Sequence, residues 1–169
     1  MRPTTEFIDR RYSDKRAEAA AWADVQARLA EAELAWIVTV RGDASPHATP
    51  MVPIVHDGKI YFHTGSNEVK YGNLLANQHV LVLVGDTGWD RGLDVSVEGI
   101  AELVTDGALV QRLAELYRTR WDGGWQLEVQ DGALVPRVPG VRLEFFEVTP
   151  RTVRSHAKSA PTSQTTYRF

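Results

Sequence analysis

The sequence predicts a mainly β fold of the α+β class: an antiparallel barrel of six or seven strands, with an N-terminal helix and two further helices. Three observations predict it. Most apolar runs after the first thirty residues are short and rich in β-branched side chains, and several alternate with polar residues. The pair Asp57-Gly58 is typical of a two-residue hairpin turn. Strands and helices do not alternate regularly, and no internal repeat is visible.

Composition limits the class of protein. A length of 169 residues suits one domain, covering 1–169. The absence of cysteine excludes disulfides and thiolate chemistry. The 19 basic and 22 acidic residues give a net charge of −3, which argues against a nucleic-acid partner. Apolar runs are too short for a membrane helix, and the N-terminus lacks the apolar core of a signal peptide. We therefore expect a soluble, cytoplasmic protein without a membrane partner.

The first element is a helix predicted over 13–33. Ser13 and Asp14 can cap it, and Trp22, Val25 and Leu29 form an apolar stripe at helical spacing. The periodicity then changes, and the β-branched run within 34–41 predicts a strand that ends at Gly42-Asp43.

The next two strands form the hairpin closed by Asp57-Gly58. The first is extended and carries Pro50 and Pro53, which need an edge or a bulge because proline donates no hydrogen bond. Counting outward from the turn places one wholly apolar set of side chains on the core face. The other face is free for a planar ligand or a partner subunit. The core set is Pro53, Val55, Ile60 and Phe62; the free set is Val52, Ile54, Tyr61 and His63.

The rest of the chain adds two helices and further strands. Asp106 is expected to cap the second of these helices, and Gly99 to mark a bulge in a long alternating strand. The tail 157–169 ends in aromatic residues and is expected to dock on the barrel or on a partner subunit. The predicted elements are a helix at 68–77, a strand at 80–84 buried on both sides, a strand at 94–104, a helix at 108–119, a loop-rich segment at 121–140 with one short hairpin, and strands at 141–148 and 151–155.

Most reactive constellations are absent from the sequence. The five histidines lack metal-binding spacing, so we expect no metal site. No nucleophile elbow, phosphate-binding Walker loop or dinucleotide fingerprint occurs. Four late carboxylates are interpreted as the solvated face of strands: Glu128, Asp131, Glu144 and Glu147.

The segment from Thr64 to Lys70 is the exception. A strand that ends in Thr64-Gly65-Ser66 and turns at once into a helix offers free backbone donors, a hydroxyl and a positive dipole end, with Lys70 nearby. Such a junction suits a phosphate. The alternative is that Ser66 caps its own helix and Lys70 is solvated.

Five pieces of the chain, in this order and spacing, resemble the pyridoxamine-5'-phosphate-oxidase-like flavin and deazaflavin oxidoreductases, over about 29–169. This resemblance implies a split β-barrel homodimer that binds a flavin-type cofactor in a groove between subunits. The pieces are Pro46 to Pro53, Tyr61 to Gly65, Lys70-x-x-Asn73-Leu74, Asp94-x-x-Val97-Glu98-Gly99, and Ser163 to Phe169.

The resemblance also implies a set of cofactor-binding residues. It places Thr49, Pro50, Met51 and Val52 along the ring system of the cofactor, His63 and Thr64 at its ribityl chain, and Ser66 and Lys70 at its phosphate.

The chain departs from the oxidase pattern at several positions. Val69 and Asp94 stand where the oxidase has Arg and Gln, so pyridoxamine phosphate oxidation is not expected. The tail is more similar to the actinobacterial deazaflavin branch, although Thr166 and Tyr167 replace Arg and Trp of that branch. A deazaflavin (coenzyme F-420) is the preferred cofactor, with FMN as the alternative.

The function implied is an oxidoreductase in which a reduced deazaflavin delivers a hydride to a small conjugated acceptor. The proton then comes from solvent or from Tyr167, and Trp89, Trp121 and Trp125 are candidate pocket walls. Three alternatives stay open: an FMN-dependent enzyme of the same family, a non-catalytic protein that binds a cofactor or tetrapyrrole, and a purely structural dimer whose groove is vestigial.

Overall fold

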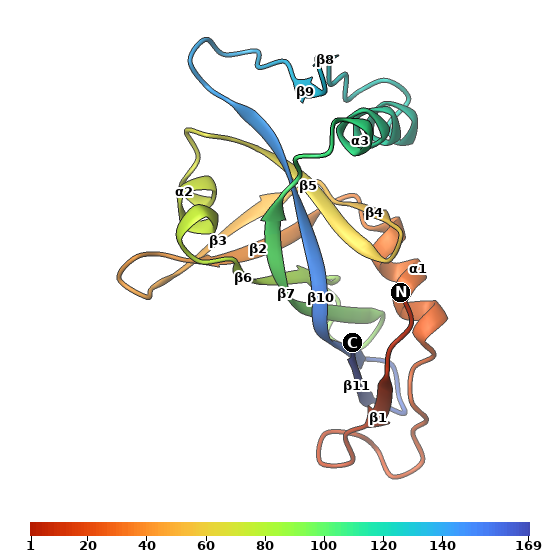
Figure 1. Cartoon of the computed structure of the whole chain (residues 1–169). Helices are drawn as coiled ribbons and strands as arrows, with labels where there is room; N and C mark the ends of the chain where they lie inside the picture. Colours follow the sequence, from red (N-terminus) through yellow and green to blue (C-terminus); the bar gives the residue numbers. More distant parts are fainter.

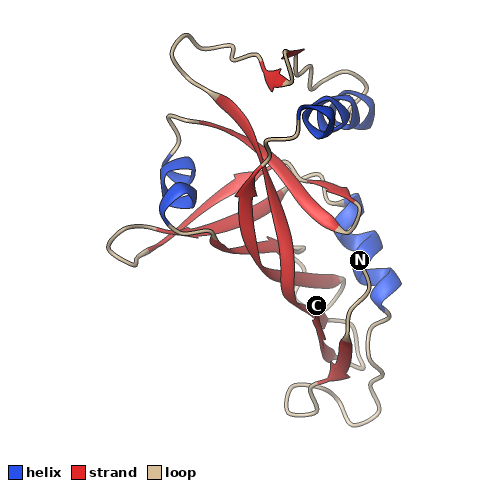
Figure 2. Ribbon diagram, viewed as in Figure 1, coloured by secondary structure: helices blue, strands red, loops and turns tan.

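The computed structural model describes residues 1–169 and contains one nine-stranded sheet, a separate two-stranded hairpin and three helices (Figure 1). The helices lie around the outside of the curved sheet (Figure 2). In chain order the elements are β1 (Thr5–Ile8), α1 (Trp22–Glu31), β2 (Ala35–Val40), β3 (Pro46–Met51), β4 (Ile54–His56), β5 (Lys59–Gly65), α2 (Val69–Ala76), β6 (His79–Val84), β7 (Leu93–Leu103), α3 (Gly107–Arg120), β8 (Val129–Gln130), β9 (Ala133–Leu134), β10 (Leu143–Ala157) and β11 (Ser163–Arg168).

The sheet is an antiparallel barrel left open at one seam. Its strand order is β1-β11-β10-β7-β6-β2-β3, and β5 pairs with both β10 and β4. The seam lies between β3 and β4, which are joined by Val52-Pro53 but pair with different neighbours. The predicted antiparallel split barrel with three helices is therefore confirmed. Pro50 and Pro53 lie at the seam, where the missing N–H of proline does not cost the sheet a hydrogen bond.

The hairpin register predicted from the turn is confirmed. Ile54 pairs with Tyr61 and Val55 with Ile60. Asp57 and Gly58 both have positive φ, 49° and 77°, as a type I′ turn requires. The second face of the hairpin is not free, however, because Ile54 and Tyr61 pack into a smaller core beneath α3.

A single long strand replaces the two predicted at the C-terminal end. β10 pairs with β7 from Phe146 to its end, with β5 through its first half and with β11 through its second. The bulge expected at Gly99 of β7 lies instead on the neighbouring strand β10, whose register shifts between Pro150 and Thr152. Gly99 instead permits close approach of the two strands, because a Cβ there would lie 2.7 Å from the carbonyl oxygen of Thr149.

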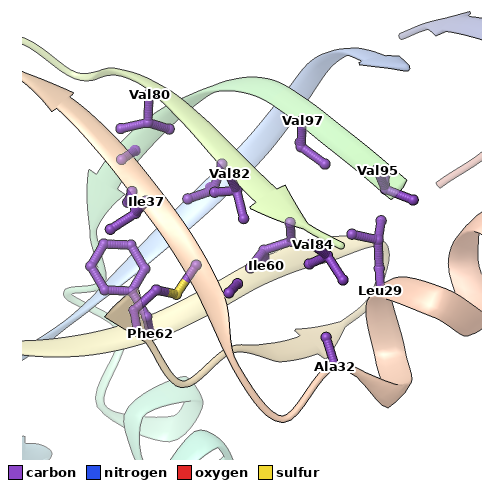
Figure 3. Close-up of a cluster of buried hydrophobic side chains, with 14 of the residues drawn as sticks. Leu29, Ala32, Ile37, Ile60, Phe62, Val80, Val82, Val84, Val95 and Val97 are labelled. Atoms are coloured by element: carbon purple, nitrogen blue, oxygen red, sulfur yellow. The ribbon is translucent and has the colours of Figure 1, made fainter. Parts of the chain in front are cut away.

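The main core fills the barrel with twenty buried residues, many of them valine and isoleucine on alternating strand positions (Figure 3). Phe62 and Phe146 stack there with ring centroids 5.8 Å apart. One expectation fails: β6 is not buried on both sides, because Leu83 faces outward while Val82 and Val84 face the core. Its outer face is therefore left open.

The N-terminal region differs most from prediction. The helix begins at Trp22, not near residue 13. Ser13 and Asp14 do not cap it; the backbone N–H of Gln164 donates to the Ser13 hydroxyl and that of Thr162 to the Asp14 carboxylate. These residues fix the C-terminal tail, which forms β11 between β10 and the unpredicted strand β1. The tail thus docks on the chain's own sheet.

The third helix and the segment after it follow the prediction. Asp106 caps α3 by accepting hydrogen bonds from the N–H groups of Ala108 and Leu109. The following segment is loop-rich and contains the short hairpin of β8 and β9. It lies with α3 over one end of β5 and β10 (Figure 1). None of the helices is long and apolar enough to cross a lipid bilayer.

Candidate functional site

The junction between β5 and α2 forms a small corner built to hold an oxyanion. Its donors are the Thr64 hydroxyl and the Gly65 N–H, which bind one oxygen of the Glu68 carboxylate at 2.9 and 3.0 Å. The ammonium group of Lys70 pairs with the other oxygen. Lys70 is only 5% exposed, so this ammonium group is held in the corner rather than in solvent. The chain's own carboxylate thus shows that an oxyanion fits here.

The corner favours the ionised form of Glu68. Burial by itself raises the pKa of this carboxyl, but hydrogen bonds from Lys70, Gly65 and Thr64 outweigh burial, so the pKa lies below its usual value. The Glu68 side chain is 44% exposed, so it borders solvent on one side. A competing anion could therefore take its place when Glu68 turns outward.

Ser66 does not cap the helix that follows it but contacts the segment before β10. Its hydroxyl accepts a hydrogen bond from the N–H of Arg142, at 2.9 Å, and its own N–H donates to the Arg142 carbonyl. No side chain caps α2, whose N-cap residue is Glu68. The alternative prediction, that Ser66 caps the helix and Lys70 is solvated, is therefore wrong. Ser66 ties the corner to the start of β10.

Glu68 is the residue that sequence reasoning missed. A signal was present, because a Glu at the start of a helix often reaches back three residues to a free N–H, as in a capping box. Glu68 does this with the N–H of Gly65. The position of Glu68 in the sequence therefore indicated that its carboxylate could bind the same donors that a phosphate would use.

A second polar cluster lies beside the corner. The buried Tyr71 donates its hydroxyl proton to Glu144, and Arg142 donates to the same hydroxyl at 2.9 Å. Glu144 pairs directly with Thr64 across the strands. The prediction that Glu144 and Glu147 are solvated is wrong, because Glu147 likewise binds Tyr61 and Lys59.

The segment expected along the cofactor ring lies on the edge strand at the barrel seam. Thr49 is half-buried and Pro50 is exposed. The Met51 side chain points into the main core, so only its backbone faces the edge. Val52 packs toward the core under α3, where its carbonyl accepts a hydrogen bond from Tyr117.

His63 does not share the surface of Thr64. Neighbouring residues of a strand point to opposite faces, so Thr64 lies at the corner while His63 lies on the face covered by α3. Its ring packs edge-on against Tyr117 and Trp125, with centroids 5.2 Å away in each case. Of the predicted residues, Thr64 and Lys70 are thus brought together. His63 points to the other face of β5, but it lines one cavity with Gly65 and Glu68 of the corner.

Tyr167, considered as a proton donor, and the three tryptophans considered as pocket walls do not lie around one site. Tyr167 is fully buried and donates its hydroxyl proton to the carbonyl of Ala20, so its position is that of an anchor for the tail. Trp89 is 87% exposed. Trp121 stacks on Tyr117. Trp125 lines a cavity that it shares with His63, Gly65 and Glu68.

Comparison with solved structures supports the fold described above. A conserved hypothetical protein from Mycobacterium tuberculosis has 22% identity and a TM-score of 0.67, with 88% of this chain and 92% of that chain covered. An F-420 reductase has 23% identity and a TM-score of 0.55, with coverage of 76% and 94%. A FAD binding protein from Mycobacterium smegmatis has 22% identity and a TM-score of 0.54, with coverage of 89% and 98%. No curated protein matches the chain.

Family membership follows from the sequence itself. The profile of the family described as pyridoxamine 5'-phosphate oxidase matches residues 21–157, which is most of the chain. The match runs from the start of the first helix to the end of β10 and includes the whole corner. The chain is a member of the pyridoxamine 5'-phosphate oxidase family.

Proposed function

We propose that this protein is an oxidoreductase that binds a flavin-type cofactor by placing the cofactor phosphate in the Glu68 corner. The observation that carries the proposal is the convergence of the Thr64 hydroxyl, the Gly65 N–H and the Lys70 ammonium on one carboxylate. The same donors suit a phosphate, with Glu68 turned out toward solvent. The ring system then follows the seam strand through Thr49 to Val52.

The preferred cofactor is the deazaflavin coenzyme F-420. Its phosphate is a diester with one negative charge, whereas the phosphate monoester of FMN carries up to two near neutral pH. Lys70 is the cation that pairs with Glu68 in the corner, and Val69 stands where an arginine would add a further charge. A singly charged phosphate also suffers less repulsion from Glu68.

The bound cofactor would supply the hydride to a small conjugated acceptor. The chain's own contribution is to hold the phosphate at the corner, to support the ring along β3 and to exclude water. No side chain has to act as acid or base in the hydride transfer itself. Tyr167 is assigned no part in proton transfer, because its hydroxyl is buried and bonded to Ala20.

The proposed enzyme is a homodimer. On the outer face of the sheet Trp36 is 49% exposed and Leu83 is 38% exposed, and the two are direct cross-strand neighbours. Val38 and Leu81 form the next pair on the same face. An apolar surface of this kind, next to the seam strand, is suited to a second copy of the chain.

The proposal is tested by titrating the purified protein with oxidised F-420, FMN and riboflavin and following cofactor fluorescence. F-420 should bind most tightly. Lys70→Ala should weaken F-420 binding by about 1–3 kcal/mol, because a charge-assisted hydrogen bond is lost. Lys59→Ala is the matched control, since Lys59 is also ion-paired but lies at the other end of β5. Equal affinity for F-420 in both variants would overturn the phosphate site.

Tighter binding of FMN than of F-420, still dependent on Lys70, would retain the site and change the cofactor. Tight binding of either cofactor without turnover by any reductant would instead support a non-catalytic cofactor-binding protein.

A further inference from the structure

A second carboxylate, that of Glu144, lies beside the Glu68 corner. Glu144 pairs directly with Thr64 across β10 and β5, so the two side chains lie on the same face of the sheet with their Cβ atoms about 5 Å apart. The Thr64 hydroxyl is one of the donors that bind the Glu68 carboxylate. The negative charge of Glu144 therefore borders the place assigned to the cofactor phosphate.

Glu144 is held more firmly than Glu68. One of its oxygens accepts a hydrogen bond from the Tyr71 hydroxyl, and the other lies 3.5 Å from the guanidinium group of Arg142. Tyr71 is itself buried and packs edge-on against Phe146, with ring centroids 5.7 Å apart. Glu68, by contrast, lies at the start of α2 and borders solvent. An entering phosphate can therefore displace Glu68 but leaves Glu144 in place.

Arg142 offsets part of the charge of Glu144. Its backbone is bound to Ser66 of the corner through two hydrogen bonds, of 2.9 and 2.7 Å. Its guanidinium group donates to the Tyr71 hydroxyl at 2.9 Å, and its side chain is 68% exposed. Because solvent and salt screen an exposed cation, the guanidinium group does not cancel the Glu144 charge fully.

The charges around the corner therefore treat two kinds of phosphate differently. Once Glu68 has turned out, Lys70 and Arg142 contribute two positive charges and Glu144 contributes one negative charge. A phosphate diester has one charge and brings this set to neutrality. A phosphate monoester carries two charges at pH 8 and leaves an excess negative charge next to Glu144. Because the Coulomb energy is proportional to the ligand charge, Glu144 opposes the monoester twice as strongly as the diester.

We infer that Glu144 is a specificity-determining residue of this site, which selects singly charged phosphate diesters over doubly charged phosphate monoesters. The inference rests on the proposed function, because it requires a cofactor phosphate in the corner. It adds a selecting charge on β10, outside the segment from Thr64 to Lys70.

The test uses two ligands that share a ring system and differ in phosphate charge: FMN, a monoester, and the methyl ester of FMN, a diester. Riboflavin, which has no phosphate, is the reference for binding of the ring. Affinities are measured by flavin fluorescence at pH 8 and low ionic strength, where screening is weak. In Glu144→Gln the affinity of the methyl ester should rise about threefold and that of FMN about tenfold, because the removed repulsion is twice as large for FMN. Riboflavin affinity should not change.

Glu147→Gln is the matched control. Glu147 lies on the same strand and is likewise held by a tyrosine hydroxyl and a cation, those of Tyr61 and Lys59. It is three residues from Glu144, so it lies about 10 Å away along the strand and on the other face of the sheet. Its substitution should leave the ratio of FMN affinity to methyl-ester affinity unchanged.

Arg142→Gln should change that ratio in the opposite direction. The variant removes the offsetting cation, so FMN should lose more affinity than its methyl ester, and the ratio should fall about twofold because the cation is exposed. Damage to the fold would weaken riboflavin binding as well. Opposite shifts of the ratio at unchanged riboflavin affinity would therefore come from charge and not from misfolding.

An unchanged affinity ratio in Glu144→Gln, or an equal rise in Glu147→Gln, would overturn the inference. If Lys70→Ala still weakened both phosphate ligands in that case, the phosphate site would stand without this selecting residue. If neither phosphate ligand bound more tightly than riboflavin, the proposed phosphate site would fail, and this inference with it.

Discussion

Lys70 is ion-paired with Glu68, two residues before it in the sequence, and both act at the point where β5 becomes α2. The pair places a negative charge inside the group of donors that we assign to the cofactor phosphate. Cofactor binding therefore has to displace a carboxylate of the chain itself.

Glu68→Gln should tighten the binding of phosphate-bearing cofactors. The amide keeps the size of the side chain but removes the competing charge, and a like-charge term of about 1.4 kcal/mol corresponds to about tenfold in affinity. Riboflavin, which has no phosphate, should gain nothing. The measurement is a fluorescence titration of both, with Glu115→Gln on the exposed surface of α3 as control. A loss of FMN and F-420 affinity in Glu68→Gln would mean that Glu68 supports the cofactor and does not compete with it.

Stability should fall between pH 7 and pH 5 because of His63. Burial lowers its folded pKa to about 4 from 6.5, with nearby Lys70 and Arg137 adding to the shift and Glu68 opposing it. Between pH 6.5 and pH 4 His63 is protonated in the unfolded chain but neutral in the folded chain. The contribution of neutral His63 to the free energy of unfolding is therefore complete above pH 6.5 and is lost as pH falls toward 4. The loss by pH 5 should be about 2 kcal/mol.

The measurement is urea unfolding at both pH values. His63→Phe, whose ring suits the aromatic surroundings, should remove most of the difference. The carboxylates with lowered pKa, among them Glu68 and Glu147, lose their contribution only below about pH 4.5 and do not obscure this range. Identical pH dependence in the two proteins would show that His63 titrates normally.

Tyr167→Phe should lower stability and spare function. The change removes the hydrogen bond to the Ala20 carbonyl and leaves the ring packed against Trp22, with centroids 5.0 Å apart. The expected loss is about 1 kcal/mol in urea unfolding. Cofactor affinity and turnover should not change. If turnover were lost at unchanged stability, Tyr167 would be a proton donor after all.

Leu83→Glu should convert the proposed dimer into a monomer. The substitution puts a charge beside Trp36 on the outer face of the sheet, where Leu83 is partly exposed and not part of the barrel core. Sedimentation should give the mass of one chain for this variant and of two for the unchanged protein. Leu75→Glu, equally apolar and more exposed on α2, should remain dimeric. A single-chain mass for the unchanged protein would remove the dimer from the account.

The parts of the fold that were predictable depend on local chemistry. Asp57-Gly58 fixes a turn type and with it the register of β4 and β5. Asp106 fixes the start of α3. Each signal acts over a few residues, so tertiary contacts cannot easily change it.

The errors arose where distant contacts decided the structure. An Ala-rich stretch after Ser13 has high helix propensity, but Ser13 and Asp14 bind the tail about 150 residues away, and the helix starts later. The apolar run of β6 is typical of a strand buried on both sides, but no other element of the chain covers its outer face. The ion pair of Lys70 was missed because charge type alone does not show whether a basic side chain is free.

The most direct test of the central claim is a crystal structure of the protein with F-420 or FMN bound. We expect the phosphate to accept hydrogen bonds from Thr64, Gly65 and Lys70, with the Glu68 carboxylate turned away from them. A bound cofactor whose phosphate lies elsewhere, with Glu68 still paired to Lys70, would contradict the account.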